Sequence, residues 1–139
     1  MIFLTLEGNA VKKQLVIPFI LAMLFAVPVV HADALAPAVD VKQAAALQSQ
    51  GAFLLDVREP SEFAEVHAKD ATLIPLGQLP SRLNEIAQYK DKPITVICRS
   101  GRRSAHAAEI LRSAGFTQVA NVEGGTNAWV GAGLPVVRN

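Results

Sequence analysis

The chain of 139 residues has little cysteine and little charge, and each scarcity excludes a class of protein. Its single cysteine cannot form a disulfide within the chain, nor supply a zinc site built from several thiolates. Thirteen basic residues nearly balance 12 acidic ones, so the net charge of +1 gives no reason to expect a nucleic-acid partner. A chain that is 51% hydrophobic is also too apolar for intrinsic disorder. At this length we expect one folded domain.

The common motifs for metal and nucleotide cofactors are missing as well. The sequence contains neither H-E-x-x-H nor C-x-x-C, and its histidines have no metal-like spacing. It also lacks both G-x-x-x-x-G-K-[ST] and G-x-G-x-x-G. We therefore expect no bound metal and no nucleotide cofactor.

Hydrophobic residues are concentrated near the N-terminus. Residues 15–30 carry no charge, two lysines precede them, and small residues follow around Ala32 and Ala34. A positive flank, a short apolar core and an A-x-A-like site are typical of a secretory signal peptide, and the run is shorter than the ~20 residues of a membrane span. We expect residues 1–32 to be a signal peptide cleaved after Ala32 or Ala34. The protein would then be exported to the periplasm with no stable membrane span; an uncleaved membrane anchor is the alternative.

In the rest of the chain, short apolar strands alternate with helical segments. We expect residues 33–38 to form a short tether and residues 39–137 to form the folded domain. The clearest strand is ITVI at 94–97, which is continuously apolar and β-branched and so fits a position buried on both faces. This alternation predicts an α/β domain with a mainly parallel sheet.

The only cysteine, Cys98, directly follows this strand and precedes a helix that we expect Ser104 to cap. Ligands of open α/β sheets bind at the carboxyl ends of the strands. Inward-pointing N–H groups, the helix dipole and neighbouring arginines would all favour the thiolate, which is the reactive form of cysteine. We therefore predict that Cys98 is a nucleophile within an anion-holding loop. The other members of this loop are Arg99, Ser100, Gly101, Arg102, Arg103 and Ser104.

Three segments resemble the signatures of the rhodanese family of sulfurtransferases. CRSGRRS at 98–104 resembles the family's active loop, and DVREPSEF at 56–63 resembles its first signature. VEGG at 122–125, followed by Ala128-Trp129 and GLPV, resembles its closing signature. The match spans residues 39–136. The resemblance implies a single rhodanese-like domain, with a five-stranded, mainly parallel sheet flanked by helices on both sides.

The resemblance also implies a double-displacement reaction without a separate cofactor. The Cys98 thiolate would attack the outer sulfur of a small anionic donor such as thiosulfate, and sulfite would leave. A persulfide on Cys98 would then pass its sulfur to a thiophilic acceptor, which can be a small molecule or a protein. This is covalent catalysis in two steps.

Roles for the loop residues follow from this expectation. Arg99 and Arg102 would guide an anionic donor by charge. Arg103 would turn inward and pair with Asp56, which braces the loop. Ser104 would donate its hydroxyl hydrogen to the sulfur.

Three positions outside the loop complete the expectations. Arg58 either contacts the loop, as Asp56 would, or forms a surface salt bridge with Glu62. Glu62 stands where two-domain thiosulfate enzymes commonly have arginine, and it would repel thiosulfate if it faced the site. Asp70 stands where the family usually has glycine.

Other functions remain open from the sequence. A persulfide carrier or a non-catalytic rhodanese-like docking module would share the same fold. A cysteine phosphatase or arsenate reductase is a further alternative. Cysteine phosphatases need arginine at the sixth residue after the cysteine, however, and here that residue is Ser104 while Arg103 is the fifth.

Overall fold

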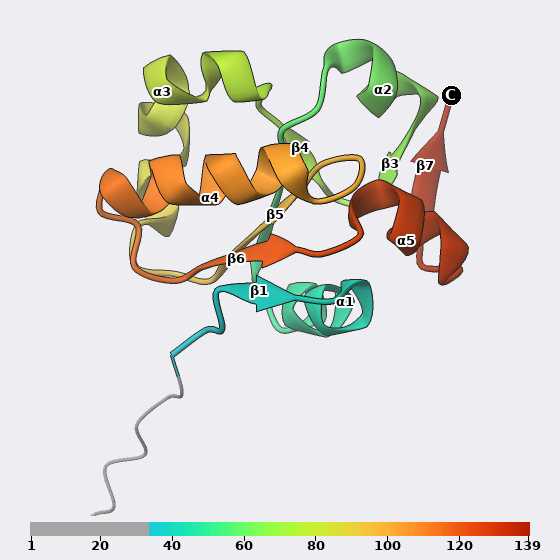
Figure 1. Ribbon diagram of the computed structural model, residues 1–139, viewed down its shortest axis with the longest axis horizontal. Helices are drawn as coiled ribbons and strands as arrows, with labels where there is room; N and C mark the ends of the chain where they lie inside the picture. The colour runs from blue at the N-terminus through green and yellow to red at the C-terminus, as the bar shows by residue number, and fades with distance from the viewer. Residues whose placement is uncertain (1–33) are drawn as a thin grey trace, which may run out of the picture. The chain divides into compact units, whose positions relative to one another are not determined.

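A computed structural model describes residues 34–139, which fold around one parallel sheet (Figure 1). The predicted signal peptide lies outside the described residues. The five strands occur in the order β1-β6-β5-β2-β4, and all neighbours are parallel, so the predicted five-stranded sheet is confirmed. The strands are β1 (Ala38–Val39), β2 (Phe53–Asp56), β4 (Thr72–Leu73), β5 (Ile94–Ile97) and β6 (Val119–Val122).

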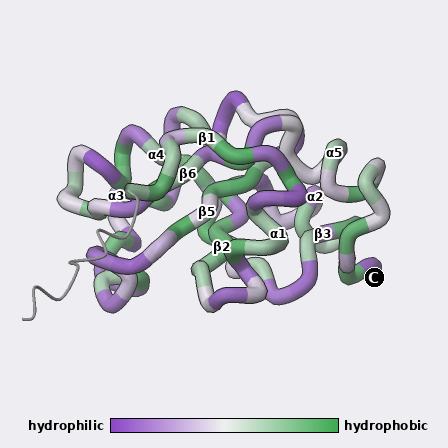
Figure 2. Tube along the Cα trace, turned by 90° about the horizontal axis from the view of Figure 1, so that it is seen from below, coloured by the Kyte–Doolittle hydropathy of each residue, from purple (hydrophilic) through white to green (hydrophobic). Residues whose placement is uncertain are grey.

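Helices cover both faces of the sheet, as predicted. They are α1 (Val41–Ser49), α2 (Pro60–Glu65), η1 (Leu76–Gln78), α3 (Leu79–Arg82), η2 (Leu83–Tyr89), α4 (Arg102–Ser113) and α5 (Gly125–Gly131). One buried apolar cluster joins α3, η2 and α4 to the sheet, and a second joins α1 and α5 to the opposite face. Every residue of β5 is buried between them. Figure 2 shows the hydrophobic stretches along the central strands, with hydrophilic stretches mainly in the outer loops.

A second, two-stranded sheet was not predicted. β3 (Val66–Ala68) pairs antiparallel with β7 (Val136–Arg138). This pairing fastens the end of the chain to the segment that follows α2, as Figure 1 shows. It places Arg138 opposite Val66, beside the cavity described below.

The first strand begins earlier than the predicted domain. Ala38, the last residue of the predicted tether 33–38, lies in β1 opposite Asn121. The N–H of Asn121 donates to the carbonyl of Pro37 over 2.9 Å, and the N–H of Glu123 donates to Val39 over 2.8 Å. The end of the predicted tether is therefore part of the sheet. Within residues 34–139, no helix is both long enough and apolar enough to cross a membrane.

Local signals explain where the helices start. Asp40 caps α1 by accepting the N–H of Gln43 over 2.8 Å, and Pro60 occupies the first turn of α2. The prediction that Ser104 caps the helix after the cysteine is wrong. α4 starts at Arg102, directly after Gly101, whose φ of 105° places it in the left-handed region. Ser104 lies inside the first turn of α4, with its hydroxyl near the sulfur of Cys98.

Asp70 has an unusual backbone conformation. Its φ is 62°, and it is the only residue other than glycine with a positive φ among residues 34–139. The turn is closed by the N–H of Ala71, which donates to the carbonyl of Ala68 over 3.1 Å. A left-handed conformation is tolerated by aspartate better than by most residues, which accounts for the departure from the family's usual glycine.

Candidate active site

The sulfur of Cys98 lies at the carboxyl end of the central strand β5, at the base of residues 98–104, the cysteine loop. The residue is 1% exposed. The N–H of Gly101 donates to Sγ over 3.1 Å, and the hydroxyl of Ser104 lies 3.2 Å from Sγ. The sequence predicted both the position of the cysteine and the role of Ser104 as a neighbour of the sulfur.

Two opposed influences set the acidity of this thiol. Burial is the largest, and it raises the pKa of Cys98 because it disfavours the charged thiolate. The Ser104 hydroxyl and the backbone N–H groups of Ser104, Gly101 and Ser100 lower the pKa by hydrogen bonding to the sulfur. The hydrogen bonds prevail, so the pKa of Cys98 lies below its ordinary value. The loop thus favours the thiolate, the nucleophilic form.

The first turn of α5 donates hydrogen bonds to the backbone of the cysteine loop. The N–H of Thr126 donates to the carbonyl of Cys98 over 2.8 Å, and the N–H of Asn127 donates to Arg99 over 3.1 Å. The Thr126 hydroxyl donates to the Cys98 carbonyl as well, over 3.1 Å. Because the first N–H groups of a helix lack partners within the helix, they are available for this contact. Neither Thr126 nor Asn127 was predicted from the sequence.

Gly125 allows α5 to come this close. A Cβ atom at Gly125 would collide with the carbonyl oxygen of Cys98 and with the backbone of Arg99. Its φ of 57° also favours glycine. The VEGG segment therefore places one helix directly against the back of the cysteine loop.

A side chain from β6 completes the surroundings of the sulfur. The Oγ atom of Ser104 lies 2.6 Å from Oδ1 of Asn121, and Nδ2 of Asn121 donates to the carbonyl of Gly101 over 3.1 Å. Asn121 was also missed from the sequence. The available signal was a polar amide within VANV, an otherwise apolar strand between two others.

Asp56 pairs with Arg58, and not with Arg103 as predicted. The Arg58 guanidinium donates to both carboxylate oxygens of Asp56, at 2.7 to 3.0 Å, and both residues are almost fully buried. Arg58 also donates to the backbone carbonyls of Glu62 and Val66. Arg58, which is only two residues from Asp56 in the chain, thus pairs with its carboxylate in place of Arg103. The hydrogen bonds of this pair go to each other and to the α2 region, so the surface salt bridge considered for Arg58 is wrong.

Arg103 reaches α2 instead. Its guanidinium donates to both carboxylate oxygens of Glu62, each over 2.8 Å. The Arg103 hydrogen bond lowers the pKa of Glu62 to about 2, against the smaller raising effect of burial. The negative charge of Glu62, expected to repel an anionic donor, is therefore neutralised by an arginine of the cysteine loop.

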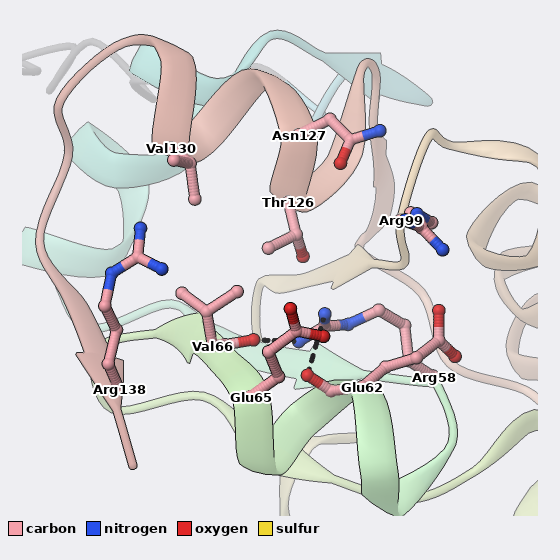
Figure 3. A pocket seen from close by; sticks show the side chains of 9 residues that line it. All are labelled: Arg58, Glu62, Glu65, Val66, Arg99, Thr126, Asn127, Val130 and Arg138. Atoms are coloured by element: carbon pink, nitrogen blue, oxygen red, sulfur yellow. Dashed lines mark hydrogen bonds between the residues drawn. The ribbon is translucent and has the colours of Figure 1, made fainter.

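The remaining loop arginines face different surroundings. Arg99 borders a cavity of about 240 Å³ (Figure 3). The other residues that line this cavity are Arg58, Glu62, Glu65, Val66, Thr126, Asn127, Val130 and Arg138. Arg102 borders a separate, more open hollow with Leu76, Ser100, Arg103 and His106. In the described part of the chain, no group of three or more His, Cys, Asp or Glu side chains is arranged to hold a metal ion.

Fold and site together define an α/β protein that holds a cysteine of lowered pKa between a central strand and a helix N-terminus. The family model of the rhodanese-like domain matches residues 40–132. The chain therefore belongs to the rhodanese family.

Known relatives agree with this assignment. A protein of Allochromatium vinosum named sulfurtransferase is 38% identical over 89 residues, covering 64% of this chain and 81% of the relative. The thiosulfate sulfurtransferase GlpE of Vibrio cholerae is 38% identical over 99 residues, covering 70% and 92%. The solution structure of a rhodanese-like domain from Anabaena sp. superposes with a TM-score of 0.68 at 28% identity, covering 76% of this chain and 81% of that one.

The segment that matches this chain makes up between 50% and 81% of the length of three curated relatives, among them the Allochromatium vinosum protein. The names of the relatives support a rhodanese-type sulfurtransferase in general.

Proposed function

We propose that this protein transfers sulfane sulfur from thiosulfate, or a similar small anionic donor, to a thiophilic acceptor through a persulfide on Cys98. The observation that carries the proposal is the surroundings of Sγ: hydrogen-bond donors at 3.1 and 3.2 Å and a lowered pKa in a buried site. A thiolate that is stabilised yet unpaired with any second cysteine suits a nucleophile that must accept one sulfur atom and release it.

In the first half-reaction, the Cys98 thiolate attacks the outer sulfur of thiosulfate. A new S–S bond forms, the S–S bond of thiosulfate breaks, and sulfite leaves with the electron pair. The product is an anionic persulfide on Cys98. The N–H of Gly101 and the hydroxyl of Ser104, which face the thiolate, are the groups that would stabilise the anion during this step.

In the second half-reaction, the acceptor attacks the outer persulfide sulfur and the Cys98 thiolate leaves. The same donors stabilise the thiolate that is released. No proton, metal or electron carrier is required for either step when the acceptor is an anion such as cyanide.

The cysteine loop also carries positive charge suited to an anionic donor. Arg103 is paired with Glu62, so Arg99 and Arg102 are the loop arginines that we propose for attracting the donor. The buried Asp56–Arg58 pair would support the α2 side of the same region rather than contact the donor.

Steady-state turnover tests the proposal. The wild-type protein is assayed with cyanide as acceptor and with thiosulfate, mercaptopyruvate or a persulfide as donor. We expect thiocyanate from at least thiosulfate, and none above background from Cys98→Ser. Wild-type turnover equal to that of Cys98→Ser with every donor, together with no persulfide on Cys98, would contradict the proposal. Persulfide formation without release to cyanide would instead indicate a carrier that serves a protein acceptor.

We also propose that the protein acts outside the cytoplasm, on the evidence of the charged flank, apolar run and small residues in its first 34 positions. Expression of the full chain with a C-terminal tag, followed by cell fractionation and N-terminal sequencing, tests this. A periplasmic product that begins at residue 33 or 35 is expected. A cytoplasmic product that retains Met1 would contradict it.

A further inference from the structure

The hydroxyl of Ser104 has one hydrogen and two acceptors. Its Oγ lies 2.6 Å from Oδ1 of Asn121 and 3.2 Å from Sγ of Cys98. Ser104 is fully buried, so bulk water does not compete for this hydrogen. A single O–H bond points at one acceptor at a time. The two neighbours therefore compete for the same hydrogen.

The orientation of the Asn121 amide follows from its second contact. One end of the amide faces the carbonyl oxygen of Gly101 at 3.1 Å, and a carbonyl can only accept. That end is therefore the NH₂ group. The other end, Oδ1, faces Ser104 and can only accept from it. The amide thus holds both Gly101 and Ser104, the two residues whose hydrogens face the sulfur.

The position of Asn121 in the sheet suggests a dedicated role. β6 lies between β1 and β5, and Val119, Ala120 and Val122 are buried in it. Side chains alternate along a strand, so Asn121 lies on the same face as Val119, the face covered by α4. An apolar residue would be expected there. Both side-chain hydrogen bonds of the amide are instead made to the cysteine loop.

We propose that Asn121 is a positioning residue that competes with the Cys98 sulfur for the hydroxyl hydrogen of Ser104. This inference deepens the proposed function, because it assumes that Cys98 is the nucleophile. When the sulfur is a neutral thiol, the hydroxyl donates to Oδ1 of Asn121. When the sulfur is an anion, the hydroxyl rotates toward Sγ and leaves Oδ1. The hydrogen stays bonded to Oγ throughout, so no covalent bond changes.

The competition has a chemical consequence for both half-reactions. Each time the thiolate forms, the hydrogen bond to Asn121 must be given up, so Asn121 keeps the pKa of Cys98 higher than Ser104 alone would. A thiolate of higher pKa is a stronger nucleophile but a poorer leaving group. Asn121 thus favours the attack on the donor at the expense of release to the acceptor.

Two single variants test the competition, with the pKa of Cys98 measured by ultraviolet thiolate absorbance and by the pH dependence of iodoacetamide alkylation. Asn121→Leu removes the acceptor while filling its space. We expect the pKa of Cys98 to fall, and alkylation below that pKa to become about threefold faster. Ser104→Ala removes the hydroxyl, and we expect the pKa to rise. Loosening of the cysteine loop would raise the pKa of Cys98 in both variants. A pKa that falls in Asn121→Leu and rises in Ser104→Ala therefore identifies competition.

The double variant Ser104→Ala/Asn121→Leu completes the cycle. If Asn121 acts through Ser104, the double variant has the same pKa as Ser104→Ala. An unchanged or raised pKa in Asn121→Leu, or a double variant that differs from Ser104→Ala, would overturn the proposal. Should Asn121→Leu fail to fold by circular dichroism, Asn121→Ala is expected to show the same sign with a smaller change, because water can enter the vacated space.

The charged surroundings are the same in all these variants. The titratable and charged groups near the site come from several parts of the fold. They are Asp56 at the end of β2 and Arg58 after it, Glu62 and Glu65 on α2, Arg99, Arg102, Arg103 and His106 on the cysteine loop and α4, Glu123 after β6, and Arg138 on β7. Neither readout depends on sulfur transfer. If Asn121 does not compete for the hydrogen, the wild-type protein can still turn over. If the protein transfers no sulfur, the differences in the pKa of Cys98 between the variants can still be measured.

Discussion

At the scale of single residues, the absence of a side chain at Gly125 determines how the cysteine loop is held. Its backbone lies against Cys98 and Arg99, so that α5 can donate hydrogen bonds to the carbonyls of both. Gly125→Ala would push these segments apart. Because small displacements of a reacting group can cost about 100-fold in rate, we expect sulfur transfer to fall by at least about tenfold.

The control for this variant lies on the same helix. Gly131→Ala adds a methyl group where nothing lies within 4 Å. We expect its rate of sulfur transfer, measured with thiosulfate and cyanide, to equal that of the wild type. Equal rates for Gly125→Ala and Gly131→Ala would show that the close approach is unimportant.

The buried pair of Asp56 and Arg58 yields a second prediction at this scale. Asp56→Asn keeps the shape of the side chain but leaves the Arg58 guanidinium buried without its counter-charge. Removal of one partner from such a pair costs about 3 kcal/mol or more in the free energy of unfolding. Urea unfolding measures this loss, with the exposed Asp40→Asn as the control that retains an equally good helix cap. A loss for Asp56→Asn no larger than the control's would contradict the pairing.

At the scale of elements, the ion pair between Glu62 and Arg103 links α2 to α4. The pKa of Glu62 is lowered from 4.5 to about 2, so the folded state binds its proton less readily than the unfolded state. The stability contributed by this pair is therefore fully present above about pH 4.5 and is lost as the pH falls toward about 2. Salt weakens the contribution, because the pair is partly exposed.

Urea unfolding of the wild type and of Glu62→Gln between neutral pH and pH 2 checks this link. The wild type should be more stable at neutral pH, and the difference should vanish at the acid end. Arg82 at the end of α3 and Glu85 in the adjoining η2 form an ion pair three residues apart, so Glu85→Gln serves as a control that leaves the α2–α4 link intact. A pH-independent difference for Glu62→Gln would contradict the assigned pKa.

The elements also show what could be predicted from the sequence. β5 and the position of Cys98 followed from an uninterrupted β-branched run next to a glycine- and arginine-rich loop. β3 and β7 were missed because three-residue strands far apart in the chain carry little periodicity of their own. The partner of Asp56 was predicted wrongly because Arg58 and Arg103 both carry suitable charge, and only their positions in the fold decide between them.

At the scale of the whole molecule, β1 determines where the folded domain begins. Val39 is buried, and the backbone of β1 pairs with β6, the strand that carries Asn121. A chain that starts at residue 34 should therefore fold fully. A chain that starts at residue 40 loses the pairing of β1 with β6, the hydrogen bond from Arg112 to the carbonyl of Pro37, and the burial of Val39. We expect its free energy of unfolding to fall by at least about 3 kcal/mol.

Urea unfolding of the two shortened chains tests this boundary. The rate of Cys98 alkylation should also change in the chain that starts at residue 40, because the loss of β1 exposes the edge of β6 at Asn121. Equal unfolding free energies for the two chains would indicate that residues 34–39 are only a tether.

The central claim is that Cys98 in the folded protein accepts one sulfur atom and passes it on. Intact-mass spectrometry after brief treatment with thiosulfate tests it most directly. We predict that the wild type gains the mass of a single sulfur atom, that cyanide removes it, and that Cys98→Ser gains nothing. A folded wild-type protein whose mass is unchanged by thiosulfate and by every other sulfane donor would contradict the account.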